Sequence, residues 1–67
     1  MSIWDDNMKN RMGTVIRKKR MQKGMTQEQL SELVSTTPGF IGQIERAEAY
    51  PSAQVLAKIV EVLGIDA

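Results

Sequence analysis

The sequence predicts an all-α fold, a compact bundle of four short helices that contains a helix-turn-helix at residues 26–46. Apolar residues recur at intervals of three and four along every segment that is long enough for a helix. Residue types that favour helix ends stand at the boundaries between these segments. No segment alternates apolar and polar residues as a half-buried strand does, so we expect no sheet.

A chain of 67 residues forms a single domain with a small core. It contains no cysteine and no histidine, which excludes disulfides and removes the commonest metal ligands and the commonest general base. We therefore expect no enzyme, no metal site and no cofactor. No apolar run approaches a membrane span or a signal-peptide core, so we expect a cytoplasmic protein that does not bind a membrane. The net charge is +1, yet seven of the nine basic residues lie between residues 9 and 23.

Residues 1–11 are expected to form an N-terminal arm or a helical extension of the domain at residues 12–67. The apolar residues from Ile3 to Met12 repeat at about four, which favours a helix, whereas chain ends often fray, which favours an arm. Trp4 has two equal interpretations, packing on the domain and contact with a partner.

The first helix of the domain is expected at residues 12–23. Val15 and Ile16 are apolar among basic residues, and Gly24 suits the left-handed position that follows a helix end. We interpret the flexible methionines of this region as core residues; they are Met12, Met21 and Met25.

The second helix is expected at residues 26–34. Thr26 suits the N-cap, with acceptor side chains two and three residues further on. Leu30, Leu33 and Val34 fall on one face, and we expect this face to be buried.

The third helix is expected at residues 37–46, after a turn of serine and threonine. Thr37 suits the N-cap and Pro38 the first helical position. Its core side is formed by Phe40, Ile41 and Ile44. The opposite side is polar and thin, formed by Gly39, Gly42, Gln43 and Arg46.

A fourth helix is expected after a loop at residues 47–51, because Pro51 disfavours the helical conformation at Tyr50. Ser52 can cap this helix, and Gly64 suits its end. The helix carries a wide apolar stripe, formed by Val55, Leu56, Ile59, Val60 and Leu63.

Several short segments together resemble the phage-repressor and Cro type of helix-turn-helix, also called the Xre family. They are Gly24-Met25-Thr26-Gln27, Leu30, Ile41, Ile44-Glu45-Arg46 and Pro51-Ser52, at the spacing of that family over roughly residues 12–65. The resemblance implies a lambda-repressor-like bundle of four or five short helices. It also implies that residues 37–46 form a recognition helix, which lies in the major groove of DNA.

The resemblance further implies which residues meet DNA. Gln27 is expected near the phosphate backbone, and Arg20 is expected to pair with Glu45. The candidate DNA-binding residues are Gln27, Thr36, Thr37, Pro38, Gly39, Phe40, Gln43, Arg46, Arg17 and Arg20.

The chain also departs from the family pattern. Ser35 stands where glycine is usual and has to accept a left-handed conformation, and Ala47 replaces another usual glycine. Ser31 replaces a small alanine, and its hydroxyl can bond back to the preceding turn. Glu48 stands where a basic residue would favour phosphates. The fifth helix of the family is missing, so the chain is a fragment or dimerises differently.

Each candidate has a plainer interpretation. The basic residues 17–23 can be a solvated helix side, and an exposed glutamine such as Gln43 is often idle. Gly39 and Gly42 can let the helix approach the groove closely, or can be tolerated drift. Phe40 can pack on the core or contact a thymine methyl group.

The sequence thus predicts a sequence-specific transcriptional regulator, a repressor that binds a palindromic operator in double-stranded DNA as a homodimer. The alternative is a protein-interaction module, an antitoxin-like or co-regulator domain that uses exposed Phe40, Tyr50 or Trp4. The weak total charge and Glu48 favour this alternative. An enzyme is a remote third interpretation, because no nucleophile and base are arranged together.

Overall fold

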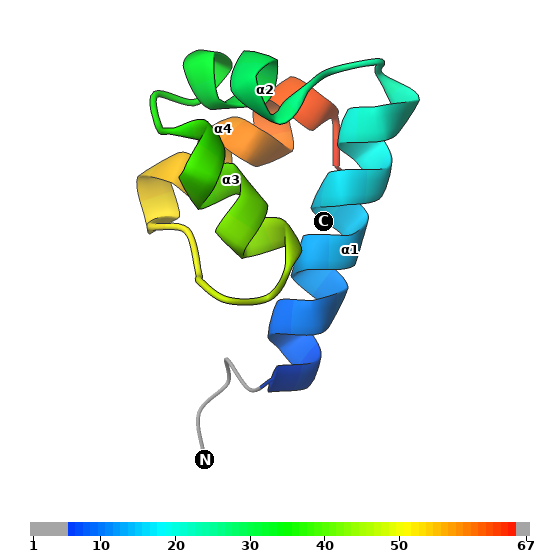
Figure 1. Cartoon of the computed structure of the whole chain (residues 1–67), viewed down its shortest axis with the longest axis vertical. Helices are drawn as coiled ribbons and strands as arrows, with labels where there is room; N and C mark the ends of the chain where they lie inside the picture. Colours follow the sequence, from blue (N-terminus) through cyan, green and yellow to red (C-terminus); the bar gives the residue numbers. More distant parts are fainter. Residues whose placement is uncertain (1–5, 66–67) are drawn as a thin grey trace.

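In the computed structural model, which describes residues 6–65, the chain folds into four α-helices joined by short turns (Figure 1). The described residues contain no strand, which confirms the predicted all-α class. The helices are α1 (Asp6–Gln22), α2 (Gln27–Leu33), α3 (Pro38–Glu45) and α4 (Ala53–Leu63).

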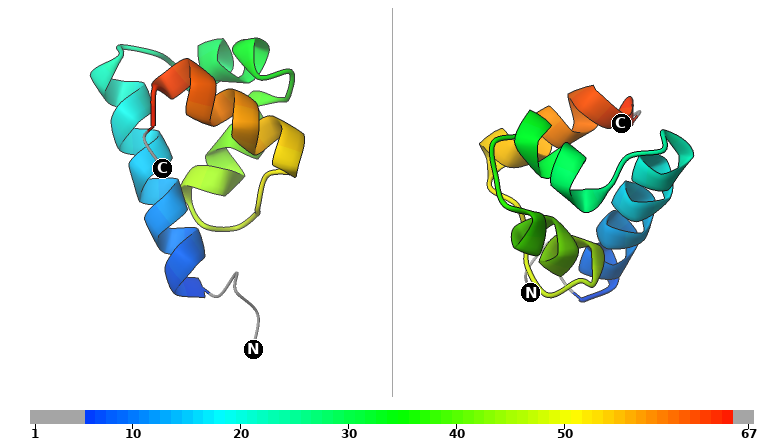
Figure 2. Two further views of the ribbon diagram at one scale, coloured as in Figure 1. Left: turned by 180° about the vertical axis from the view of Figure 1, so that it is seen from behind. Right: turned by 45° about the horizontal axis from the view of Figure 1, so that its top comes forward.

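The four helices surround one small core. α1 and α2 each pack against both α3 and α4. Figure 1 shows α3 in front of α4 with α1 along one side, and Figure 2 shows the same arrangement from behind. The core side chains are almost fully buried and come from all four helices; they are Ile16, Leu30, Val34, Ile41, Ile44, Ile59 and Leu63.

Side-chain caps begin three of the helices where they were predicted. The Thr26 hydroxyl accepts a hydrogen bond from the Gln29 backbone N–H at 3.0 Å, and the Gln29 side chain accepts one from the Thr26 N–H at 2.9 Å. Thr37 and Ser52 cap α3 and α4 in the same way, each through the N–H three residues on. These contacts satisfy backbone groups that a helix start leaves without partners.

The start of α1 lies within the segment for which an arm or a helical extension was expected. The helix begins at Asp6 rather than at residue 12, so residues 6–11 agree with the helical extension. Residues 6–11 are therefore the first turns of α1, and Met8 continues the apolar spacing that Met12 opens. Residues 1–5, with Ile3 and Trp4, lie outside the described part of the chain.

Each helix ends on one residue in the left-handed conformation. The residue after it donates its N–H to a helix carbonyl five residues back, as Thr36 does to Ser31 at 2.9 Å and Glu48 to Gln43 at 2.8 Å. Glycine holds the left-handed position after α1 and α4, with Gly24 at a φ of 69° and Gly64 at 65°. The other two are Ser35, at 60° as predicted, and Ala47, at 63°.

Three apolar residues predicted to be buried, or placed among the apolar residues of a helix, are exposed instead. Leu33 is 54% exposed, because the buried arc of α2 runs from Leu30 through Val34 to Ser31 and leaves Leu33 outside it. Met21 is 59% exposed on the side of α1 that faces away from Ile16, so it is not a core residue. Val15 lies at the core edge and is 40% exposed. Met12 and Met25 pack against the core as predicted.

Candidate nucleic-acid interface

The outward side of α3 and the turn before it expose most of the candidate residues. Those that are exposed are Thr37, Pro38, Gly39, Gln43 and Arg46, together with Arg17 on α1. Four others are half-buried: Arg20, Gln27, Thr36 and Phe40. Phe40 packs against the hydrophobic core, which agrees with its packing interpretation.

Glu45 joins α3 to both preceding helices. Its carboxylate accepts hydrogen bonds from Arg20, at 2.6 Å from Nε and 3.1 Å from Nη2, which confirms the expected pair. It also accepts a bond of 3.1 Å from Gln27 Nε2 at the start of α2. The Glu45 side chain is 3% exposed and that of Arg20 is 12% exposed, so water screens this pair weakly. We call Arg20, Gln27 and Glu45 the Glu45 cluster.

The Glu45 cluster uses much of the hydrogen-bonding capacity of Arg20. The guanidinium Nη1 donates to the Met25 carbonyl at 2.7 Å, so all three guanidinium nitrogens bond to protein oxygens. The hydrogen bond to Glu45 raises the pKa of Arg20, although burial opposes the rise. The geometry gives Arg20 a structural role, and its contact with DNA stays a prediction.

Gly42 lies beneath the side chains of Gln27 and Arg46. The residue is buried, which corrects the expected outward position, because it faces α2 rather than solvent. A Cβ atom on Gly42 would lie 2.9 Å from Arg46 Nη1 and 3.6 Å from both amide atoms of Gln27. Gly39, in contrast, is exposed and has open space around it. The idea that a bare backbone approaches DNA therefore applies to Gly39 alone.

Arg46 and Glu48 form a second ion pair, at the end of α3. Arg46 Nε lies 3.1 Å from Glu48 Oε2, and Nη2 lies 3.2 Å from Oε1. Their side chains are 58% and 55% exposed. The hydrogen bond from Arg46 lowers the pKa of Glu48, and the same contact raises the pKa of Arg46. Glu48 stood out in the sequence, but its pair with Arg46 was not predicted, because a spacing of two outside a helix predicts no contact.

Arg17 lies beside the end of α3. With Lys18 and Met21 of α1 it lines a hollow that also includes Glu45. The cation is therefore next to the candidate interface and stays available to an anion. Near the other end of α1, Lys9 contacts the loop that precedes α4. Its Nζ atom lies 4.9 Å from the centre of the Tyr50 ring. Tyr50 is half-buried, so it is less exposed than the alternative interpretation assumed.

The described residues offer no group of three acidic side chains that could hold a metal ion. None of the four helices combines the length and the apolar character that crossing a membrane would require.

A capped helix, a tight left-handed turn and a second capped helix with an exposed polar side define the helix-turn-helix class. A sequence model of the family described as "Helix-turn-helix" matches residues 16–67. The chain therefore belongs to the helix-turn-helix family, of the Xre and phage-repressor type that the sequence resembles.

Individual proteins agree with this class. The crystal structure of the clp gene regulator ClgR from Corynebacterium glutamicum is similar, with a TM-score of 0.78 and 30% identity over 84% of this chain and 60% of that chain. A putative multi-protein-binding factor 1 from Yarrowia lipolytica is 39% identical over 81% of this chain and 36% of its own length. An endothelial differentiation-related factor 1 homolog from Xenopus laevis is 37% identical over 90% of this chain and 41% of its own. The chain spans about two fifths of these two relatives.

Proposed function

We propose that this chain is the sequence-specific DNA-binding domain of a repressor that acts in the cytoplasm. In this proposal α3 enters the major groove of a palindromic operator, and two copies bind as a homodimer with their recognition helices about 34 Å apart. One observation carries the proposal: Gln43 and Arg46 are exposed on a helix whose orientation the Glu45 cluster holds. We assign no catalytic activity to the chain.

The candidate residues divide into two roles. Gln43 has the side chain that can bond adenine with two hydrogen bonds, so we assign it to base recognition. Arg46 and Arg17 are exposed cations at the end of α3 and beside it, so we assign them to phosphates. The remaining exposed residues of the turn, Thr37, Pro38 and Gly39, are assigned to sugars and base edges.

The names of similar proteins support regulation but differ in its form. ClgR is described as a gene regulator, which favours direct binding to DNA. The Eremothecium gossypii relative is named a multiprotein-bridging factor, which favours contacts with other proteins. The Arg46–Glu48 pair also favours this second candidate function, because it neutralises a cation on the side that is proposed to face DNA.

Selection of bound duplexes from a random pool tests the proposal. We expect an enriched palindromic site, with Gln43→Ala losing about 1–3 kcal/mol of discrimination at one base pair of each half-site. Gln54→Ala is the matched control, because Gln54 is an exposed glutamine on α4. No binding to any duplex at about 50 mM salt, where phosphate contacts are strong, would favour the protein-interaction module. An enriched site that Gln43→Ala leaves unchanged would remove Gln43 from base recognition.

A further inference from the structure

Gly42 lies in the middle of α3, where its lack of a side chain needs an explanation. Glycine is a poor helix former, and Gly42 has an ordinary helical backbone, unlike Gly24 and Gly64 with their positive φ. A Cβ atom at this position would lie 2.9 Å from Arg46 Nη1, closer than such atoms normally approach, and the next two atoms belong to the Gln27 amide. Two neighbouring side chains therefore occupy the space that a side chain of residue 42 would fill.

The obstacle at Gly42 differs in kind from the one at Gly13. At Gly13 a Cβ atom would meet backbone carbonyl oxygens of α3, which cannot move unless the two helices separate. At Gly42 it would meet the end of the Arg46 side chain, which is 58% exposed and can swing into solvent. Alanine at position 42 would therefore displace the guanidinium and leave the fold intact.

The two side chains that meet above Gly42 both keep N–H groups for an anion. Nε and Nη2 of Arg46 bond to Glu48, whereas Nη1 has no hydrogen-bond partner in the described part of the chain. Gln27 Nε2 donates one of its two N–H groups to Glu45 and has no second acceptor among the described residues. Both nitrogens lie within 3.6 Å of the point where a Cβ atom of Gly42 would stand. One phosphate group of DNA, which has several acceptor oxygens, can therefore bond to both.

We propose that Gly42 is a positioning residue of the DNA interface. It lets the Arg46 guanidinium lie against α3 beside the Gln27 amide, so that the two side chains bind one phosphate together. This role rests on the proposed function, which assigns Arg46 to phosphates, and it adds the residue that determines where Arg46 lies. A side chain at position 42 would separate the two donors and weaken their joint contact with DNA.

The test is a double-mutant cycle on the affinity of the full chain for a random duplex, measured by fluorescence anisotropy at about 50 mM salt. Gly42→Ala should weaken binding severalfold and Arg46→Gln about tenfold, since each affects a phosphate contact. The double variant should bind no more weakly than Arg46→Gln alone, because no guanidinium is left for the alanine to displace. An additional loss in the double variant would overturn the proposal, because the alanine would then act on DNA directly.

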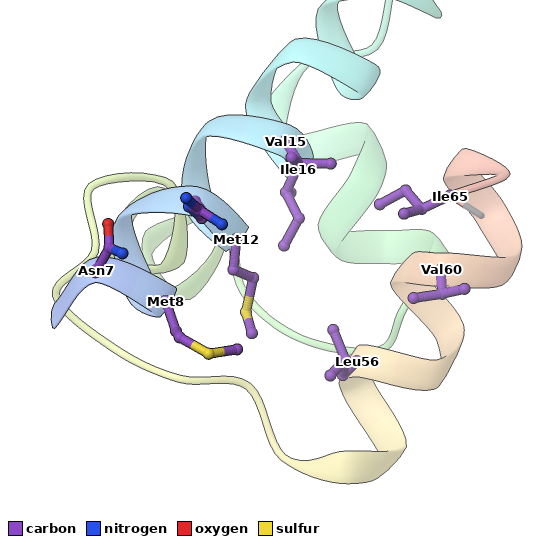
Figure 3. A pocket seen from close by; sticks show the side chains of 9 residues that line it. Asn7, Met8, Met12, Val15, Ile16, Leu56, Val60 and Ile65 are labelled. Atoms are coloured by element: carbon purple, nitrogen blue, oxygen red, sulfur yellow. The ribbon is translucent and has the colours of Figure 1, made fainter. Parts of the chain in front are cut away.

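Arg11→Gln provides the matched background for this cycle. Arg11 is an exposed arginine of α1 beside the apolar groove between α1 and α4 that Figure 3 shows, and no residue of α3 lines this groove. Gly42→Ala should cause the same loss of affinity in this background as in the wild-type chain. If Arg11→Gln removes the effect of the alanine as Arg46→Gln does, the loss reflects the total charge and the proposal is wrong.

The position of Arg46 can be checked without DNA. One of the two Gly42 α-protons points along the direction of the missing Cβ atom, so NMR should show a nuclear Overhauser effect between it and the Arg46 side chain. The melting temperature of Gly42→Ala should equal or exceed that of the wild-type chain, because alanine favours helix and only a flexible side chain has to move. Absence of the Overhauser effect, or a lower melting temperature, would overturn the proposal.

The proposed function and the role of Gly42 fail in different ways. A chain that binds no duplex would refute the proposed function and the role of Gly42 with it. Binding that Arg46→Gln weakens and Gly42→Ala leaves unchanged would refute the role of Gly42 alone.

Discussion

Arg20 of α1 and Glu45 of α3 meet in a two-bond ion pair, with Nε 2.6 Å from Oε2 and Nη2 3.1 Å from Oε1. The two residues are 25 positions apart in the chain, so the pair is a tertiary contact. The same carboxylate accepts a hydrogen bond from Gln27 of α2. It therefore links α3, the helix that is proposed to read DNA, to both α1 and α2.

Glu45→Gln should destabilise the fold by about 3 kcal/mol, because it leaves the Arg20 guanidinium, whose side chain is only 12% exposed, without its anion. For a domain of this size, such a loss lowers the melting temperature by roughly 10–20 °C. Thermal denaturation followed by circular dichroism measures it. Glu61→Gln, at an exposed position of α4, is the control and should change stability by less than about 0.5 kcal/mol. Equal melting temperatures for the two variants would show that the pair contributes little.

The two left-handed residues that are not glycine predict stabilising substitutions. Ser35→Gly and Ala47→Gly should each raise the free energy of unfolding by roughly 0.5–1 kcal/mol, since glycine relieves the strain but loses more entropy on folding. The reverse change, Gly24→Ala, should be destabilising, because Gly24 has a φ of 69°. Urea denaturation checks the signs, and a loss of stability in both glycine variants would contradict the strain argument.

Gly13 of α1 lies against the end of α3 with no room for a side chain. A Cβ atom there would lie 2.6 Å from the Ile44 carbonyl oxygen and 2.7 Å from that of Glu45. Gly13→Ala should therefore destabilise the fold by about 1–3 kcal/mol, although alanine favours helix. Asn10→Ala is the control on an exposed position of the same helix and should be neutral or stabilising. A more stable Gly13→Ala variant would mean that α1 and α3 separate without cost.

Helix ends were predictable from the sequence because capping acts over a few residues. Thr26, Thr37 and Ser52 each satisfy a backbone N–H three residues away, so local sequence was sufficient. The fate of Leu33 was not predictable in this way. Leu30 and Val34 could share a buried face of α2 either with Leu33 or with Ser31. Only the packing of α2 against α3 and α4 determines that Ser31 is buried and Leu33 is exposed.

The candidate interface was predictable in part for the same reason. The periodicity of α3 correctly predicted that Gln43 and Arg46 are exposed, but it wrongly predicted the same for Gly42. A glycine has no side chain whose polarity indicates whether the position is buried. The burial of Gly42 depends on Gln27, which belongs to another helix. The contact of Arg46 with Glu48 depends on the left-handed conformation of Ala47, and an alanine in the sequence does not predict that conformation.

Glu48 is predicted to weaken binding to DNA by competing with phosphate for Arg46. Glu48→Gln should tighten binding to a random duplex severalfold and steepen the salt dependence by up to about 0.9, the effect of one further phosphate contact. Glu32→Gln, an exposed carboxylate on α2, is the control. The measurement is the affinity of both variants for a duplex between about 50 and 200 mM salt. Identical salt dependence of the two affinities would show that Arg46 does not reach a phosphate.

The same pair predicts a pH effect. Arg46 lowers the pKa of Glu48, so the contribution of the pair to stability is present above the ordinary glutamate pKa and is lost as the pH falls through the lower pKa of Glu48. Titration of the Glu48 side chain by NMR should show this lowered pKa. The Arg46→Gln variant should return it toward the ordinary value, and an unchanged pKa in that variant would assign the shift to another cause.

Arg17 and Arg20 should behave oppositely although both are arginines of α1. Arg17 is exposed beside the end of α3, so Arg17→Gln should weaken binding to all duplexes alike, lower the salt slope by about 1 and leave the melting temperature unchanged. Arg20 has its three guanidinium nitrogens bonded to protein oxygens, so Arg20→Gln should lower the melting temperature first. Salt-dependent binding and thermal melts of both variants separate the two roles. A lower salt slope in Arg20→Gln with an unchanged melting temperature would instead assign that guanidinium to a phosphate.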